Sequence, residues 1–281
     1  MKRLFLFFVF VVCFTQISHS QFFNYQFDTI GLAQSMVVYS MDYRVDTNNI
    51  EAVSTEEMLL LIGDGASCYQ SNKLFKFYQE IEKKRQEGTL MKWLTDGYSV
   101  NEYVSYNVYK IYKGYPSNKI TTIDNAGLEG LFQYEENIDL FDWVIYDDTT
   151  SINGYFSQKA SCNYGGRSWI AWFTPEIPYS DGPYKFCGLP GLIVKLEDTQ
   201  QHYSFIIQSI IKPTDDIYIE WEDKNYIKTT KCDFIKARYN ASQTISESFK
   251  DNNVFGQNSV VYEKMNKLYQ SRNNPIELDR K

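Results

Sequence analysis

Histidine is scarce in this sequence, and its cysteines are scattered. The 281 residues include two histidines, of which only His202 lies beyond residue 20, and five cysteines. Catalytic zinc sites usually take two or three histidines, and zinc knuckles need closely spaced cysteine pairs, which this chain lacks. The glycines around Gly188 also lack the Lys-Ser/Thr sequence of a phosphate-binding loop. We therefore expect no metal site and no cofactor.

Positive charge is also in deficit. The chain has 28 basic and 35 acidic residues, which gives a formal net charge of −7. A protein that binds a phosphate backbone carries a basic patch or stripe as its electrostatic footprint. Nucleic acid is therefore not an expected partner.

No apolar run is long enough to span a bilayer as a helix, which takes about 20 residues. The run from Leu4 to Phe14 is shorter, follows Lys2 and Arg3, and precedes Ser18-His19-Ser20. This pattern is typical of a signal peptide, here residues 1–20, and the alternative is an uncleaved anchor. We expect residues 21–281 to form one β-rich domain that is periplasmic, outer-membrane-associated or secreted.

Aromatic residues are abundant, with 23 tyrosines and 19 phenylalanines, and they suit the half-buried surface of a sheet. Alternating or short apolar segments predict strands at 36–43, 58–62, 100–109, 192–197, 202–210 and 217–221. Helical spacing predicts helices at 72–87, 233–249 and 259–269, and the polar tail 271–281 could be loose. The sequence thus predicts a mainly β (α+β) fold: a curved antiparallel sheet, shaped as a bowl or part-barrel, with a few covering helices.

The segment from Lys159 to Asp198 is the most distinctive part of the chain, and it holds four of the seven prolines. Proline fixes φ, and glycine adopts conformations that other residues avoid. We therefore expect a stiff, irregular loop between two strands. Its motif residues are Gly182, Pro183, Gly188, Leu189, Pro190 and Gly191.

This segment resembles the GLPGLI family of exported Bacteroidetes proteins, which is named for the run from Gly188 to Ile193. The resemblance includes Gly-Gly-Arg at 165–167, Ala-Trp-Phe-Thr from 171, Gly-Pro-Tyr-Lys-Phe from 182, and the flanks 141–143 and 274–278. It is strongest over 141–210, and it brings no reaction, cofactor or catalytic residue with it. Some similar chains also look like the bowl-shaped N-terminal accessory module of a secreted peptide N-glycanase.

The motif also contains candidate ligand-binding side chains. The guanidinium of Arg167 could bind an anionic ligand, or it could pair with Glu176 or Asp198 and fix the loop. The aromatic residues could line an apolar groove for a sugar, lipid or peptide, or they could pack in the core under the loop. The candidate ligand-binding residues are Arg167, Trp169, Trp172, Tyr184 and Phe186.

Cysteine positions suggest a disulfide. Removal of the signal peptide leaves four cysteines, and an even number in an exported chain favours disulfides. Cys162 and Cys187 flank the motif loop, so we predict a bond between them if their segments lie side by side. The alternative is two buried thiols that fill gaps in the core. Cys68 and Cys232 could pair or stay reduced.

Three classes of function fit these features. We favour a non-enzymatic envelope protein that binds a lipid, peptide, glycan or envelope partner in a β-bowl. The second is a carboxylate-dependent hydrolase, or an accessory module, that acts on glycans or peptides; the third is a structural or assembly module. A catalytic triad or a cysteine–histidine dyad would have to use His202, the only histidine beyond residue 20.

Overall fold

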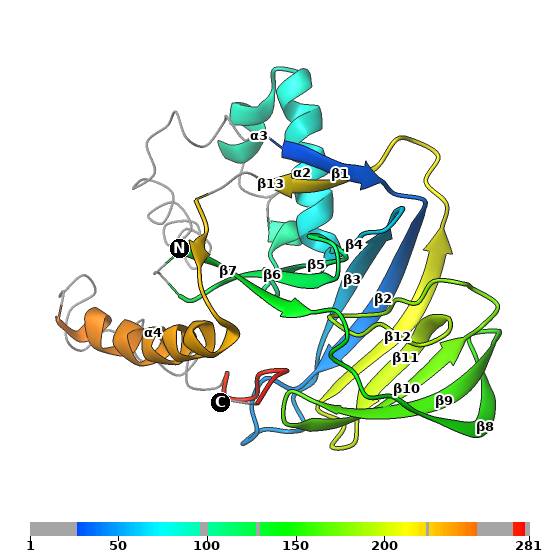
Figure 1. The fold of residues 1–281 in the computed structure, drawn as a ribbon. Coiled ribbons are helices and arrows are strands. Elements are labelled where there is room, and N and C mark those ends of the chain that lie inside the picture. Colours follow the sequence, from blue (N-terminus) through cyan, green and yellow to red (C-terminus); the bar gives the residue numbers. More distant parts are fainter. Residues whose placement is uncertain (1–26, 96–100, 128–129, 223–224, 252–271, 279–281) are drawn as a thin grey trace.

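The protein is built around one large open antiparallel sheet (Figure 1). The computed structural model describes residues 27–95, 101–127, 130–222, 225–251 and 272–278. The sheet has twelve strands in the order β14-β7-β6-β5-β4-β3-β2-β12-β11-β10-β9-β8, and β14 alone runs parallel to its neighbour. Its strands are β2 (Ser35–Tyr43), β3 (Ser54–Ile62), β4 (Ser67–Ser71), β5 (Lys110–Lys113), β6 (Lys119–Asn125), β7 (Leu131–Asn137), β8 (Val144–Ile152), β9 (Tyr155–Tyr164), β10 (Arg167–Thr174), β11 (Leu192–Asp198), β12 (Tyr203–Ile211) and β14 (Ile227–Lys228).

A two-stranded ribbon and three helices complete the described part of the chain. The ribbon pairs β1 (Phe27–Leu32) with β13 (Tyr218–Glu222). The helices are α2 (Asn72–Gln86), α3 (Leu90–Thr95) and α4 (Lys231–Asp251), and a short 3₁₀ turn, η1, covers Asn101–Tyr103. None of these helices is long and apolar enough to cross a membrane. The mainly β fold with a curved sheet and few helices confirms the predicted fold class.

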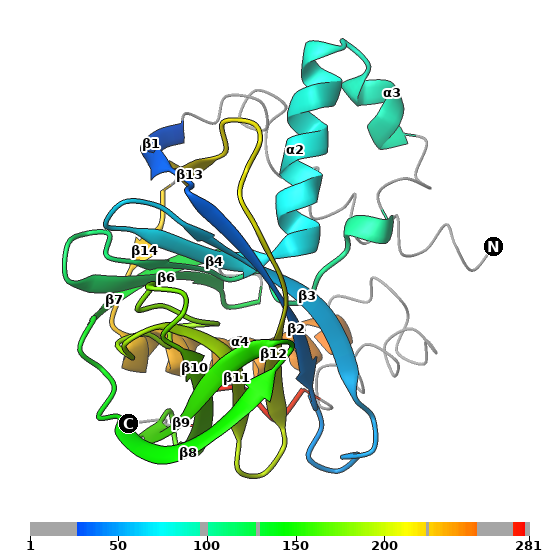
Figure 2. The same ribbon diagram turned by 90° about the vertical axis from the view of Figure 1, so that its right-hand side faces the viewer.

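The sheet is strongly curved (Figure 2), and different parts of the chain pack against its two faces. The inner face carries the main core, where side chains of β2, β10 and β12 pack against the loop 175–191 between β10 and β11. On the opposite face, Ile219 of β13 and Phe75 of α2 pack against Leu59 and Leu61 of β3. A third cluster joins Phe234 of α4 to Phe132 and Tyr134 of β7.

The first turn of helix α2 is capped by a side chain, and a glycine follows its last turn. Ser71 has an extended conformation, and its hydroxyl accepts a hydrogen bond from the amide of Leu74, which caps the first turn. Gly88 follows the helix with φ of +69°, the left-handed conformation that commonly ends a helix. The predicted helix 72–87 is therefore confirmed, whereas the predicted helix 259–269 and the predicted signal peptide lie outside the described residues.

The predicted strand 100–109 is wrong. Residues 101–103 form η1, and β5 begins only at Lys110. Side chains rather than a strand partner hold this segment, because Ser105 and Asn107 donate hydrogen bonds to the carboxylate of Glu56 at 2.5 and 2.7 Å. The alternation of apolar and polar residues therefore does not correspond to a strand with one buried face here, since the side chain of Tyr106 is exposed.

Candidate functional site

The motif loop 175–191 fills the inner face of the sheet. Tyr184, Phe186 and Leu189 are buried, and the ring of Phe186 lies 4.8 Å from that of Trp169 and 4.9 Å from that of Phe141. The hydroxyl of Tyr39 on β2 donates to the carbonyl oxygen of Ile193. Three of the predicted ligand-binding residues, Trp169, Tyr184 and Phe186, are therefore buried in the core, and of these only Trp169 also borders an open groove, which is described below.

Glycines in the motif allow close approach of backbone segments. Gly191 has φ of +149°, and a Cβ there would overlap the carbonyl group of Thr174. A Cβ on Gly182 would lie 2.8 Å from the Cβ of Ile193. The motif is thus explained by packing of the loop against the ends of β10 and β11.

We expect Gly191→Ala to lower the free energy of unfolding by about 1–3 kcal/mol, because the new Cβ combines backbone strain with a clash. Gly31→Ala is the matched control, since an ideal Cβ at Gly31 meets no atom within 4 Å. Urea unfolding of both variants measures the difference. Equal stability of the two variants would contradict this account of the motif.

Arg167, at the start of β10, binds the segment 272–278 near the C-terminal end of the chain. Its Nε donates to the carbonyl oxygen of Ile276 at 3.0 Å, and its Nη2 donates to Asn274 Oδ1 at 2.6 Å and to the carbonyl oxygen of Pro275 at 2.8 Å. Its Nη1 pairs with Asp198 at 3.0 Å and lies 3.1 Å from Nδ1 of His202. The buried guanidinium is therefore committed to structural contacts, and of the two predicted partners it uses Asp198.

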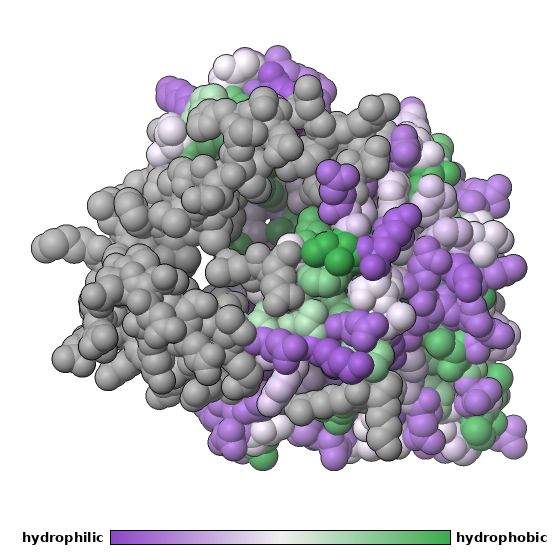
Figure 3. Space-filling model, turned by 60° about the vertical axis from the view of Figure 1, so that its left-hand side comes forward, coloured by the Kyte–Doolittle hydropathy of each residue, from purple (hydrophilic) through white to green (hydrophobic). Residues whose placement is uncertain are grey.

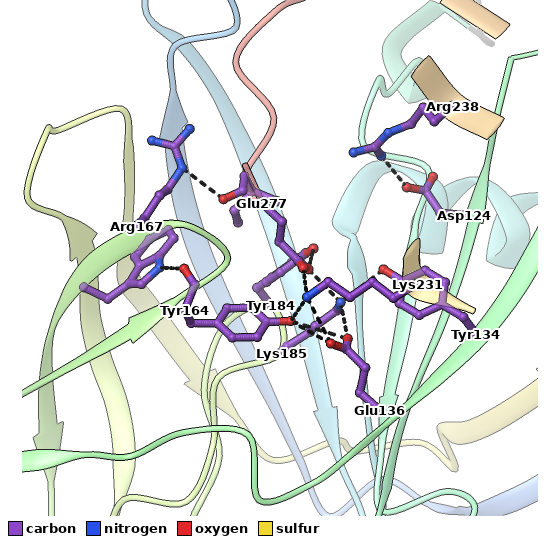
Figure 4. Close-up of polar contacts among 12 residues, drawn as sticks. Asp124, Tyr134, Glu136, Tyr164, Arg167, Tyr184, Lys185, Lys231, Arg238 and Glu277 are labelled. Atoms are coloured by element: carbon purple, nitrogen blue, oxygen red, sulfur yellow. Dashed lines mark hydrogen bonds and ion pairs between the residues drawn. The ribbon is translucent and has the colours of Figure 1, made fainter. Parts of the chain in front are cut away.

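The contacts of Arg167 with Asp198 and the segment 274–276 are called the anchor. An ionic cluster, defined as Lys185, Glu136, Glu277 and Lys231, lies beside it (Figure 4). The ammonium group of Lys185 is fully buried and pairs with Glu136 at 2.5 Å and Glu277 at 2.6 Å. Lys231, at the start of α4, pairs with both carboxylates as well. The hydroxyl of Tyr184 donates to Glu277 at 2.6 Å.

The electrostatics of this cluster favour the charged forms. Burial raises the pKa of Glu277, but Lys185 and Lys231 outweigh it and lower this pKa to about 2. Burial works against the charge of Lys185, yet Glu277 and its other neighbours hold the pKa of Lys185 well above its ordinary value. The cluster therefore fastens the motif loop, β7, α4 and the segment 272–278 together.

The expectation that the tail could be loose is wrong for its described residues 272–278. Asn274, Ile276 and Glu277 are buried, and the amide of Leu278 donates to the carbonyl oxygen of Gly165. The segments 165–167, 182–186 and 274–278, which are far apart in sequence, thus meet at one place. Sequence reasoning did not single out Lys185, and the only available signal was a lysine between two aromatic residues inside the motif.

The predicted disulfide between Cys162 and Cys187 is not formed. All four cysteines of the described residues are free thiols. Burial raises the pKa of Cys162 to about 12 and that of Cys187 to about 11, and Cys187 Sγ lies 3.8 Å from the carbonyl oxygen of Ile138. Both cysteines belong to the main core, so they act as small apolar residues there.

An open groove of about 500 Å³ lies on the outer face of β8, β9 and β10. Ser168 and Ile170 reach it because they alternate along β10 with the buried Arg167 and Trp169. The groove combines apolar and hydrogen-bonding side chains, and its lining includes Asp142, Val144, Tyr146, Lys159, Ser161 and Asn163. Trp172, the remaining predicted ligand-binding residue, is half-buried and does not line it.

Tyr146 is the one aromatic side chain of β8 in this groove, and it is 39% exposed. Its hydroxyl lies 2.9 Å from Ser161 Oγ, and Lys159 Nζ lies 5.5 Å from the centroid of its ring. Asn163 and Asp142 line the same groove. The groove can therefore offer a ring surface together with hydrogen-bond donors and acceptors.

Comparisons with known proteins show that the motif is similar to an uncharacterised family. A family model described as "Protein of unknown function (Porph_ging)" matches residues 165–195. The match falls on the motif. It covers part of the segment on which the GLPGLI resemblance rests, although the family model does not carry that name. No curated protein sequence matches the chain.

The fold also has a counterpart among solved structures. A structure of PNGF-II in space group P21 matches with a TM-score of 0.50 and 12% sequence identity, over 75% of this chain and 34% of that chain. A second structure of PNGF-II, in space group C2, has a TM-score of 0.49 and 11% identity over 74% and 33% of the two chains. This chain thus spans about a third of the length of PNGF-II, and the likeness concerns the fold alone.

Proposed function

We propose that this chain is an exported envelope protein that binds a saccharide, without catalysis, in the groove of β8, β9 and β10. The groove carries this proposal because it is open to solvent and offers mixed chemistry on a rigid sheet. The filled inner face of the sheet does not favour binding inside a bowl, since the motif loop occupies that space. The proposed site therefore lies on the outer face of these strands, where Trp169 is the one predicted ligand-binding residue that borders it.

The lining suits a ligand that has both C–H surfaces and many hydroxyl groups. Val144, Ile170 and the ring of Tyr146 provide apolar contact. Asp142 accepts hydrogen bonds, Lys159 donates them, and the amide of Asn163 does both. A saccharide presents matching groups along its length, whereas a lipid tail would leave these polar groups without partners.

A peptide that adds a strand to the sheet fits less well. β8 is an edge strand, and its pairing with β9 is interrupted by a register shift between Ile145 and Thr149. Asp147 and Asp148 lie within this interruption. Bulges and charges of this kind protect an edge against strand addition.

A hydrolase also fits less well. Most glycoside hydrolases use two carboxyl groups on either side of the bond that is cleaved. Asp142 is the carboxylate among the residues that line the groove. The buried carboxylates of Glu136 and Glu277 are engaged in the ionic cluster.

The proposed location and family rest on the sequence. The charged start, the apolar run 4–14 and Ser18-His19-Ser20 support cleavage before Gln21 and export to the envelope. The motif from Gly188 to Ile193 supports membership of the GLPGLI family. The partial coverage of PNGF-II agrees with a fold that also occurs as one part of a longer chain, and so with an accessory module.

Tyr146→Ala is expected to weaken saccharide binding at least about tenfold, because its ring is exposed in the groove whereas the other aromatic residue there, Trp169, is buried. Screening the native protein on an array of oligosaccharides identifies a ligand, and titration calorimetry then compares the variants. Tyr218→Ala is the matched control, since Tyr218 is a similarly exposed tyrosine on β13. Absence of any bound saccharide, or equal losses in the two variants, would refute the proposal.

A further inference from the structure

The helices α2 and α3 form an arm, defined as residues 72–95, that extends away from the sheet (Figure 2). Asn72 is the only buried residue of α2, and Leu90 is the only one of α3. The two helices hold each other through aromatic contacts, with 5.8 Å between the ring centroids of Phe77 and Trp93. The turn between the helices is therefore the tip of a projecting element, and the described part of the chain buries little of it.

The arm is basic in an otherwise acidic protein. It has six basic and three acidic residues, a net charge near +3, whereas the whole chain has a net charge of −7. The last turn of α2 contains Lys83, Lys84 and Arg85, and Lys92 lies in the short helix α3 that follows. The charge of the arm is thus opposite in sign to that of the remaining molecule.

Part of this positive charge forms no ion pair among the described residues. Lys84 pairs with Glu80 and Glu87, and Arg85 pairs with Glu82. Among the described residues, no acidic side chain lies within ion-pair distance of Lys83 or Lys92. Both ammonium groups are exposed at the tip and free to meet an anionic partner.

An apolar side chain lies beside these cations. Met91 is 57% exposed and precedes Lys92 in α3. Hydrophilic and apolar residues lie close together at the upper end of the molecule, where the arm is found (Figure 3). A flexible apolar side chain among cations is typical of elements that lie at a membrane interface.

We propose that the tip of the arm docks on a membrane surface that carries anionic phosphate headgroups. Each lysine or arginine near such a surface adds electrostatic attraction, and Met91 can enter the headgroup region. The acidic remainder of the molecule is repelled by the same surface, which turns the arm toward it. Figure 1 places β8 and β9 at the opposite end from the α2–α3 turn, so the saccharide groove would remain accessible.

The inference does not depend on the proposed saccharide site, and vesicle binding tests it separately. The mature chain is sedimented with vesicles of equal parts phosphatidylcholine and phosphatidylglycerol, and with vesicles of phosphatidylcholine alone. Binding is expected only to the anionic vesicles and should weaken as salt is added. The double variant Lys83→Glu/Lys92→Glu is expected to bind at least about tenfold more weakly.

The double variant Lys212→Glu/Lys228→Glu is the matched control, because it changes the net charge equally at exposed positions outside the arm. It should keep most of the binding. Three outcomes would overturn the proposal: equal binding to both vesicle types or to neither, an equal loss in the two double variants, or binding of polyglutamate in solution without binding to vesicles. The last outcome would identify an acidic polypeptide as the partner instead.

Discussion

Replacing Arg167 with methionine is expected to lower the free energy of unfolding by about 3–5 kcal/mol, because the change leaves the buried carboxylate of Asp198 without its cation. The segment 274–276 also loses the three hydrogen bonds that it accepts from the guanidinium. Urea unfolding measures the stability. Hydrogen exchange should show increased exchange at 274–278, where the amide of Leu278 bonds to Gly165.

Arg85→Met is the control for this prediction. Arg85 also pairs with a carboxylate, Glu82, but the pair lies on the surface of α2. Exposed ion pairs contribute about 1 kcal/mol or less, so this variant should be close to the parent in stability. A loss for Arg167→Met no larger than that for Arg85→Met would show that the anchor contributes little to stability.

Local patterns predicted five of the fourteen described strands, because alternation reports a strand with one buried face. The predicted strands 36–43 and 202–210 coincide with β2 and β12, whose buried residues alternate with half-buried ones. Strands such as β5 and β6 were not predicted, because both of their faces are covered and their buried runs include polar residues such as Thr121 and Thr122. Alternation of apolar and polar residues marks only strands with one solvent-exposed face, so it does not predict β5 and β6.

The candidate sites depend on contacts between distant segments, which the sequence pattern does not show. Lys185 meets Glu136 and Glu277, which lie 49 and 92 residues away. The groove depends on the outer face of three paired strands, and the sequence pattern does not show that its lining residues come together. The motif did predict a stiff loop, because glycine and proline act locally, but it could not show that the loop fills the inner face.

The stability of the protein should fall in acid, and Glu277 should account for a large part of the fall. Its pKa is lowered from an ordinary value of 4.5 to about 2 in the folded state. Between these two pH values the unfolded chain binds the proton that the folded protein excludes, so stability decreases as pH falls through this range. Above about pH 4.5 the contribution is complete, and the pKa difference corresponds to about 3 kcal/mol.

Glu277→Gln is therefore expected to flatten the stability profile between about pH 4.5 and pH 2, and to lower stability at neutral pH because Lys185 and Lys231 lose a charged partner. Urea unfolding of parent and variant across this range gives the two profiles. Glu197→Gln serves as the control, since Glu197 pairs with Lys195 outside the ionic cluster and its loss should leave the acid-dependent fall in place. If Glu277→Gln kept the slope of the parent, the ionic cluster would not be the source of the acid sensitivity.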